Sequence, residues 1–220
     1  MSLALVPSRA LLGLDAPAVT VEVHLANGLP GFTLVGLADT EVKEARERVR
    51  SAIQNSGLEF PANKRITVNL APADLPKDSG RFDLPIALGI LAASGQVPAA
   101  ALHNHVFAGE LSLSGSLRPV RGALAMAAAL QQQGDAAPLV LPQGSAEEAA
   151  LVPGVRVYRA AHLLDVVRHF LPAGQDTPPG RNTLEALQPS ACLPDPVYPD
   201  MADVKGQAAV RRALEICAAG

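Results

Sequence analysis

Residues 82–94, with the sequence FDLPIALGILAAS, restrict the possible folds more than any other segment of the chain. The segment carries one charged side chain, Asp83, and is otherwise almost wholly apolar. This composition predicts a helix that is apolar on every side and therefore buried at the centre of a domain. Pro85 fits its first turn, where a missing backbone N–H group costs nothing. The segment is shorter than the roughly 20 apolar residues that cross a membrane.

The first half of the chain predicts the elements that would enclose this helix. Alternating apolar and polar residues indicate strands at residues 19–25, 32–35 and 65–71. Turn residues at 28–31 predict that the first two strands form a hairpin. Residues 39–55 have apolar side chains at helical spacing, which predicts an amphipathic helix with one face on the core.

The second half predicts shorter elements. A hairpin is expected from residues 106–113 and 116–118, strands at 139–141 and 155–158, and helices at 121–133, 146–151 and 160–170. This mixed order favours an α+β fold, with helices packed on a mixed or antiparallel sheet, over a doubly wound parallel sheet.

Composition divides the chain into three regions. Residues 1–171 form the predicted compact domain. Residues 172–199 are rich in Pro, Gly, Gln, Thr and Ser without periodicity, which predicts a linker or extended arm. Residues 200–220 become helical again but have no core of their own, so we expect the first helix of a second domain that the sequence does not include.

Charge and cysteine content limit the partners and the compartment. The net charge is -3, so no global positive field attracts nucleic acid or a membrane, and a DNA contact requires a local basic patch. The two cysteines, Cys192 and Cys217, lack metal-ligand spacing and indicate reduced thiols in a cytoplasmic protein. Residues 1–12 are apolar but short and interrupted by Arg9, so we expect no signal peptide.

Six segments in order resemble the ComM/YifB-type Mg-chelatase-like AAA+ ATPases. They are TVEV at 20–23, GLPGFTLVG at 28–36, VKEARERVRSAIQN at 42–55, VNLAPADLPK at 68–77, FDLPIALGILAA at 82–93 and GELSL at 109–113. Residues 203–220 are similar to the family's lead-in to its AAA+ module. The resemblance covers almost the whole chain apart from the linker.

The resemblance implies a two-layer fold like the C-terminal domain of Lon proteases, of the type of ribosomal protein S5 domain 2. It implies an accessory domain of a homo-oligomeric, hexameric motor that acts like a helicase on branched DNA in recombination or natural transformation. Because no G-x-x-x-x-G-K-[ST] loop occurs in the chain, we expect no ATP binding or hydrolysis by this part alone. ATP and Mg²⁺ are expected cofactors of the full-length protein.

The Lon likeness raises the alternative of an ATP-dependent peptidase of the Ser–Lys class. Such a site needs a serine hydroxyl within hydrogen-bond reach of a lysine whose pKa is lowered. By comparison with active Lon-like enzymes, the nucleophile position falls on Arg81 and the lysine position on Leu124, while Ser79 comes too early. We therefore expect no catalytic residues. A magnesium-chelatase subunit is a further alternative.

The candidate DNA-binding or subunit-contact residues are basic. They are Lys43, Arg46, Arg50, Lys77, Arg81, Arg118 and Arg121, with Lys64 and Arg65 as further candidates. Several converging cations would neutralise phosphates. The opposing interpretation is a solvated face on which Glu41, Glu44 and Glu47 pair with the cations, at about 0.3–0.5 kcal/mol per pair.

Three carboxylates on the polar loop at 72–81 and just after it are a possible site for a hard cation. They are Asp74, Asp78 and Asp83. We favour a different role for Asp83, which either caps the central helix or pairs with Arg81, and we expect no metal.

Overall fold

The computed structural model describes residues 2–36, 40–77, 80–171, 184–187, 200–203 and 205–219, without the side chains of residues 40–43 and 202. The chain divides into two compact units, Met1–Pro189 and Ser190–Gly220. The second unit contains the short helix η2 (Met201–Asp203) and helix α7 (Ala208–Ala219), in which no residue is buried.

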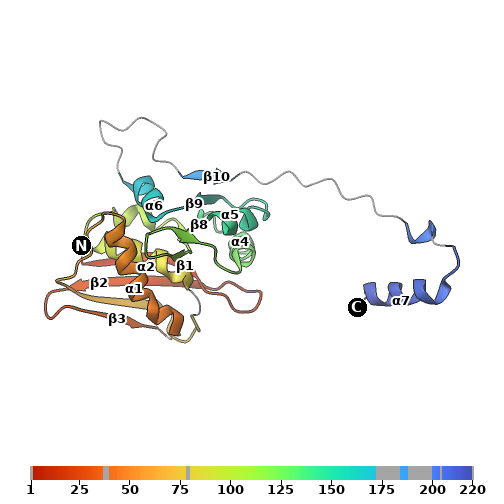
Figure 1. Ribbon diagram of the computed structural model, residues 1–220, viewed down its shortest axis with the longest axis horizontal. Coiled ribbons are helices and arrows are strands. Elements are labelled where there is room, and N and C mark those ends of the chain that lie inside the picture. The colour runs from red at the N-terminus through yellow and green to blue at the C-terminus, as the bar shows by residue number, and fades with distance from the viewer. Residues whose placement is uncertain are drawn as a thin grey trace. The chain divides into compact units, whose positions relative to one another are not determined.

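The first unit is built on a four-stranded mixed sheet (Figure 1). Its strands, in spatial order, are β1 (Leu3–Arg9), β2 (Ala18–Ala26), β4 (Arg65–Ala71) and β3 (Gly31–Val35). The register places Val6 opposite Val21 and Val21 opposite Leu70, and all three side chains are buried. Alternate residues of the strands therefore form one apolar face, as the period of a strand requires.

The predicted hairpin of residues 19–25 and 32–35 is wrong, because β4 lies between β2 and β3. β3 pairs with β4 in parallel, with Phe32 opposite Ile66. Parallel neighbours need a crossover connection, and helix α1 (Thr40–Asn55) provides it. The strand β1 was not expected from the sequence. Pro7 lies within it, which is tolerated because β1 is at the edge of the sheet.

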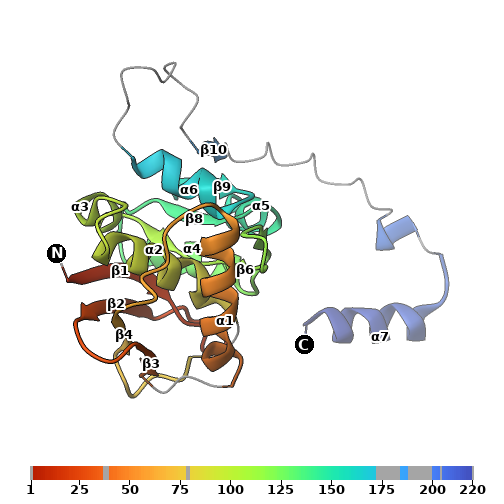
Figure 2. The same cartoon turned by 60° about the vertical axis from the view of Figure 1, so that its left-hand side comes forward.

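Helix α2 (Asp83–Ala93) lies on this sheet with every residue buried, which confirms the predicted central helix. Gly89 allows the close approach: a Cβ atom there would lie 2.5 Å from Cγ2 of Val23 on β2. Helix α1 packs beside α2 through a stripe that includes Val49 and Ile53. In both ribbon views α1 and α2 lie side by side, next to the strands of this sheet (Figures 1 and 2).

A second four-stranded sheet completes the unit, so the expectation of one sheet is wrong. It contains β10 (Glu185–Leu187), β9 (Val157–Ala160), β8 (Leu139–Pro142) and β5 (Val106–Phe107), in that order. β5, β8 and β9 are parallel, and β10 is antiparallel to β9. The coarse prediction of an α+β fold with helices on mixed sheets is confirmed.

The second sheet is covered on both faces, which explains why its short strands are so apolar. Val140 points to the core shared with α2, and Leu139 and Leu141 point to a second core. That second core is completed by α4 (Ala123–Gln132) and α5 (Gln143–Ala149). Helices α3 (Ala99–Leu102) and α6 (Leu163–Phe170) contribute to the first core.

The structure differs in part from two further predictions, the second hairpin and the linker. The hairpin is formed only by β6 (Glu110–Leu111) and β7 (Leu117–Arg118), because residues 106–107 join the second sheet instead. Within the predicted linker, residues 185–187 form β10, and Leu184 beside it is buried. The rest of residues 172–199 lies outside the described residues.

Candidate nucleic-acid interface

A small pocket lies at the outer edge of the first sheet, where β3, α1 and the segment before β4 meet. We call it the edge pocket, and its volume is about 140 Å³. It is lined by Pro30, Gly31, Phe32, Arg46, Arg50, Phe60, Pro61, Ala62, Lys64 and Ile66. The lining therefore combines two aromatic rings with three cations.

Helix and strand periodicity bring these side chains together. Arg46 and Arg50 are one turn apart on α1, so they lie on the same flank of the helix. The adjacent stripe, which includes Ala45 and Val49, is buried and fixes which flank faces the pocket. On β3, Phe32 is held opposite Ile66 by the parallel register.

The three cations of the edge pocket have different neighbours. Nε of Arg46 lies 3.3 Å from Oε1 of Glu47, and both side chains are at least half exposed. The guanidinium of Arg50 lies over the ring of Phe60, with Cζ 5.8 Å from the centroid, in cation–π geometry. Nζ of Lys64 donates a hydrogen bond to Oδ1 of Asn27 at 2.7 Å.

The solvated-face interpretation of α1 is only partly realised. Glu47 pairs with Arg46, but Glu44 lies 3.9 Å from Arg48, which is not a candidate residue. Exposed pairs of this kind are weak, at about 0–1 kcal/mol, so Arg46 can exchange Glu47 for a phosphate at little cost. Arg65 is exposed opposite Gly31 and extends the basic edge. The side chain of Lys43 lies outside the described residues.

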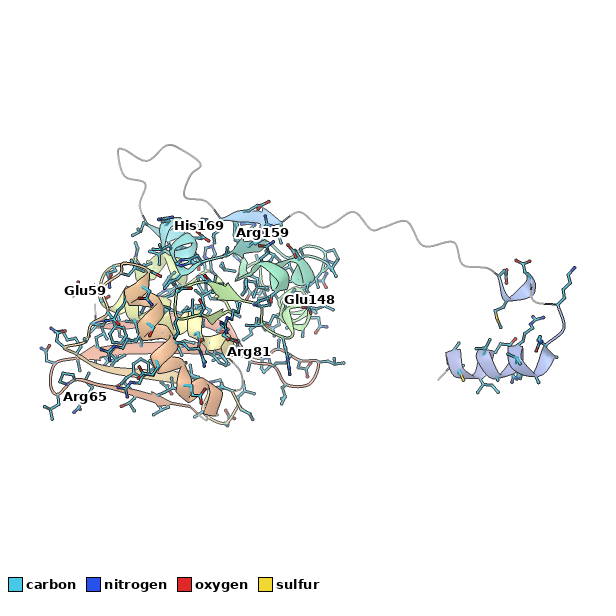
Figure 3. All side chains as sticks on the ribbon, viewed as in Figure 1. Glu59, Arg65, Arg81, Glu148, Arg159 and His169 are labelled. Carbon is cyan, nitrogen blue, oxygen red and sulfur yellow. The ribbon has the colours of Figure 1, made fainter. Side chains whose placement is uncertain are left out.

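Lys77 and Arg81 are both 1 % exposed, so the expectation that they contact DNA from an exposed loop is wrong. Nζ of Lys77 donates to the carbonyl oxygen of Pro72, and burial lowers the pKa of the Lys77 amine. The backbone carbonyl of Arg81 accepts a hydrogen bond from the backbone N–H of Gly109 at 2.9 Å. Figure 3 shows Arg81 among the helices and Arg65 at the periphery.

Arg118 and Arg121 are exposed but do not line the edge pocket. Nη1 of Arg118 lies 3.4 Å from Oε1 of Glu110, its neighbour across the β6–β7 hairpin. The structure therefore brings Arg46 and Arg50 together with Lys64, and leaves Arg118 and Arg121 as a separate group.

The positions that correspond to a Ser–Lys peptidase site carry no such pair. Arg81 is buried, and Leu124 on α4 is 44 % exposed. Within the part of the chain that the structure describes, no serine hydroxyl hydrogen-bonds a lysine, and the Lys77 amine is bound by Pro72. Ser79 lies outside the described residues.

Asp83 was expected to cap the central helix or to pair with Arg81, and both expectations are wrong. Its partner is Arg48 of α1. Oδ2 of Asp83 accepts from Nε of Arg48 at 2.7 Å, and Oδ1 accepts from Nη2 at 3.1 Å. The backbone N–H of Leu111 on β6 donates to Oδ2 at 3.1 Å. The carboxyl group therefore links α1, α2 and the β6–β7 hairpin.

Burial raises the pKa of Asp83 to about 6, although the hydrogen bonds from Arg48 oppose the increase. The sequence contained a signal for this pair: a lone carboxylate in an apolar buried helix requires a charged partner. Asp74 is exposed, Asp78 lies outside the described residues, and among the described residues no three His, Cys, Asp or Glu side chains are grouped to hold a metal.

The aromatic part of the edge pocket was missed by sequence reasoning. Phe82, Phe107 and Phe170 are buried in the core. Phe32 and Phe60, the remaining two of the five phenylalanines, are only partly buried, and both line the edge pocket. The signal available was the position of Phe60, which lies just before the basic pair Lys64 and Arg65.

Two comparisons show which known proteins this chain is similar to. Residues 21–145 match the family model described as subunit ChlI of Mg-chelatase. The chain is 50 % identical to the competence protein ComM of Haemophilus influenzae, covering 100 % of this chain and 42 % of that protein. It is 47 % identical to the uncharacterized protein YifB of Escherichia coli K12, covering 100 % and 41 %. With Rv2897c of Mycobacterium tuberculosis H37Rv, identity is 39 %, covering 97 % and 40 %.

The chain thus spans about two fifths of the length of the curated relatives it matches. No helix in the described residues has the length and apolar character needed to span a bilayer. The similarity to ComM and YifB confirms the resemblance inferred from the six segments. Because the family match at residues 21–145 takes in more than half of the sequence, the chain belongs to the family of the Mg-chelatase subunit ChlI.

Proposed function

We propose that this chain is the N-terminal accessory domain of a AAA+ ATPase and that it binds DNA for a helicase-like motor in recombination or natural transformation. The relatives are more than twice as long, which leaves room for a motor module that would bind ATP and Mg²⁺. The name of the Haemophilus influenzae relative, a competence protein, supports a role in DNA uptake or processing. The proposal includes assembly of the full-length protein into a homo-oligomeric, hexameric ring in the cytoplasm.

The edge pocket is the observation that carries the DNA-binding part of the proposal. The chain has a net charge of -3, yet Arg46, Arg50, Lys64 and Arg65 gather at one edge of one sheet. A local cluster of this kind neutralises phosphates even on an acidic protein, because screening limits the reach of distant carboxylates to about 10 Å.

The proposal assigns the domain a Lon-like scaffold without peptidase activity. Arg81 and Leu124, at the positions of the nucleophile and the lysine, cannot supply a Ser–Lys pair. The purified chain should therefore leave casein intact. Cleavage that is lost in Ser79→Ala would establish the peptidase alternative. The family match by itself also suits a magnesium-chelatase subunit, and the basic edge pocket favours DNA over that function.

The decisive experiment is a fluorescence-anisotropy titration of a labelled forked DNA with single-stranded arms against the 220-residue chain at several salt concentrations. Arg46→Gln/Arg50→Gln removes two cations of the pocket, and Arg156→Gln/Arg168→Gln removes two exposed cations elsewhere, so net charge is matched. If both pocket cations contact phosphates of a single-stranded arm, the slope of log affinity against log salt falls in magnitude by about 1.4 in the pocket variant only. Equal slopes in the two variants would remove the pocket from the model.

A further inference from the structure

We propose that the edge pocket binds one unpaired base of a single-stranded nucleic acid, stacked on Phe60 and Phe32, with the adjoining phosphates on Arg46, Arg50 and Lys64. The inference rests on the proposed DNA-binding function and adds to it the strand type and a contact that is not electrostatic. A purely electrostatic patch needs no aromatic ring in its lining, whereas this pocket is lined by two partly buried rings.

The aromatic rings are the first argument. Phe32 and Phe60 pack on the core but leave part of each side chain uncovered, which costs hydrophobic free energy, whereas the other three phenylalanines are buried. Phe32 reaches the pocket from β3 and Phe60 from the segment before β4, so the two rings come from different elements. Stacking of bases on aromatic side chains is the common device of proteins that bind single strands without sequence preference.

The size of the pocket is the second argument. Its volume of about 140 Å³ is close to that of an engineered cavity of roughly 150 Å³ that holds one benzene molecule. The space therefore suits one planar ring system and not a folded peptide or a duplex. A base in a duplex is already stacked on both faces, so only an unpaired base can enter.

The arrangement of the cations is the third argument. The guanidinium of Arg50 lies over the Phe60 ring with Cζ 5.8 Å from the centroid, so a base that stacks at Phe60 also meets a planar cation. Arg46 lies one turn away on α1, and Lys64 reaches the pocket from the segment before β4 and donates to Asn27. Cations that reach an aromatic site from two different elements match a strand whose phosphates adjoin the stacked base.

The test uses the absence of tryptophan from the chain. Phe60→Trp places one tryptophan in the edge pocket, and Tyr158→Trp places one on β9 as the control. Each variant is titrated with a 12-nucleotide oligo-dT and with an abasic strand of the same length and charge. We expect oligo-dT to quench the emission of Phe60→Trp and the abasic strand to leave it unchanged, with no quenching of Tyr158→Trp. Equal emission with the two strands overturns the proposal.

Affinity provides the second measurement. Phe60→Leu keeps an apolar side chain and removes the ring, so oligo-dT should bind roughly 5- to 100-fold more weakly while the abasic strand binds as before. Unchanged oligo-dT affinity in Phe60→Leu overturns the stacking proposal. If Arg46→Gln/Arg50→Gln still weakens binding, the proposed DNA-binding function survives that result. If neither variant changes binding, both proposals fall.

Discussion

The pair formed by Arg48 and Asp83 should make the stability of the domain depend on pH in a direction opposite to that of most carboxylates. Asp83 is fully buried, and Arg48 is 21 % exposed. The perturbation is Arg48→Met, which keeps the side-chain length and removes the charge. At pH 8 it leaves an ionised carboxylate in the core, and loss of one partner of a buried pair costs about 3–5 kcal/mol.

At pH 5 the same substitution should cost less. The folded-state pKa of Asp83 is about 6, so the carboxyl group is already mostly protonated at pH 5. A neutral carboxylic acid loses only hydrogen bonds when Arg48 is removed, at about 1–2 kcal/mol. We therefore expect the destabilisation by Arg48→Met to be about two to three times as large at pH 8 as at pH 5.

The chain without substitutions should also become less stable as Asp83 loses its proton. The pKa of Asp83 is raised from 3.8 to about 6, so between these pH values the folded state binds the proton more tightly than the unfolded state. The contribution of Asp83 to the free energy of unfolding is complete below pH 3.8 and is lost as the pH rises to about 6. The difference between 3.8 and about 6, at about 1.36 kcal/mol per pH unit, corresponds to about 3 kcal/mol.

The assay is urea denaturation, followed by circular dichroism, at pH 5 and pH 8. Arg46→Met is the matched control on the same helix, because Arg46 pairs with exposed Glu47 and its loss should cost at most about 1 kcal/mol at either pH. An equal destabilisation by Arg48→Met at the two pH values would refute the burial argument for Asp83.

Three further outcomes are expected. Gly89→Ala should destabilise the domain by about 1–3 kcal/mol in urea denaturation, because its Cβ would lie 2.5 Å from Val23, while Gly144→Ala has 3.5 Å of clearance and should be nearly neutral. Burial, and His169 nearby, lower the pKa of His105, so the contribution of His105 to the free energy of unfolding should fall as the pH drops below 6.5, opposite in sign to that of Asp83; a His105→Phe variant with the same pH dependence as the unsubstituted chain would contradict this. Lys77→Met should leave the salt slope of DNA binding unchanged in anisotropy titrations, because the amine is buried on Pro72.

The sequence was sufficient for elements whose pattern is long and strongly periodic. The central helix α2, the amphipathic helix α1 and the strands β2 and β4 were all predicted close to their observed bounds. Each of them carries enough apolar residues at one period to outweigh local exceptions. The family resemblance could also be recognised from the sequence, because it depended on several segments that occur in a fixed order.

Strand pairing could not be predicted from the sequence, because the alternation of apolar and polar residues identifies a strand but not its neighbour in the sheet. The pairing of β3 with β4 depends on the path of α1 between them. Strands such as β5 (Val106–Phe107) are two residues long, too short for a period to be recognised. The ring of His105 packs on Phe170 at 4.8 Å between centroids, and a contact between residues so far apart in sequence leaves no local pattern.

The candidate site was predictable in part. Arg46 and Arg50 were identified from helical spacing, and they do share a pocket. Lys77 and Arg81 were misjudged because Pro, Gly and Asp beside them indicate an exposed loop. The amine of Lys77 is turned inward onto the carbonyl oxygen of Pro72, and the backbone of Arg81 is bound by Gly109, a residue distant in sequence, so the composition of the loop did not indicate that either side chain is buried. Phe32 reaches the pocket through the pairing of β3 with β4, so it could not be found before that pairing was known.

The most direct measurement of DNA contact at the edge pocket is a nuclear magnetic resonance titration of the ¹⁵N-labelled chain with oligo-dT. The backbone amides of residues 31–32, 46–50 and 60–66 should shift together and saturate at one dissociation constant. Shifts confined to α4 and α5, or the absence of any saturable shift at low salt, would contradict the account.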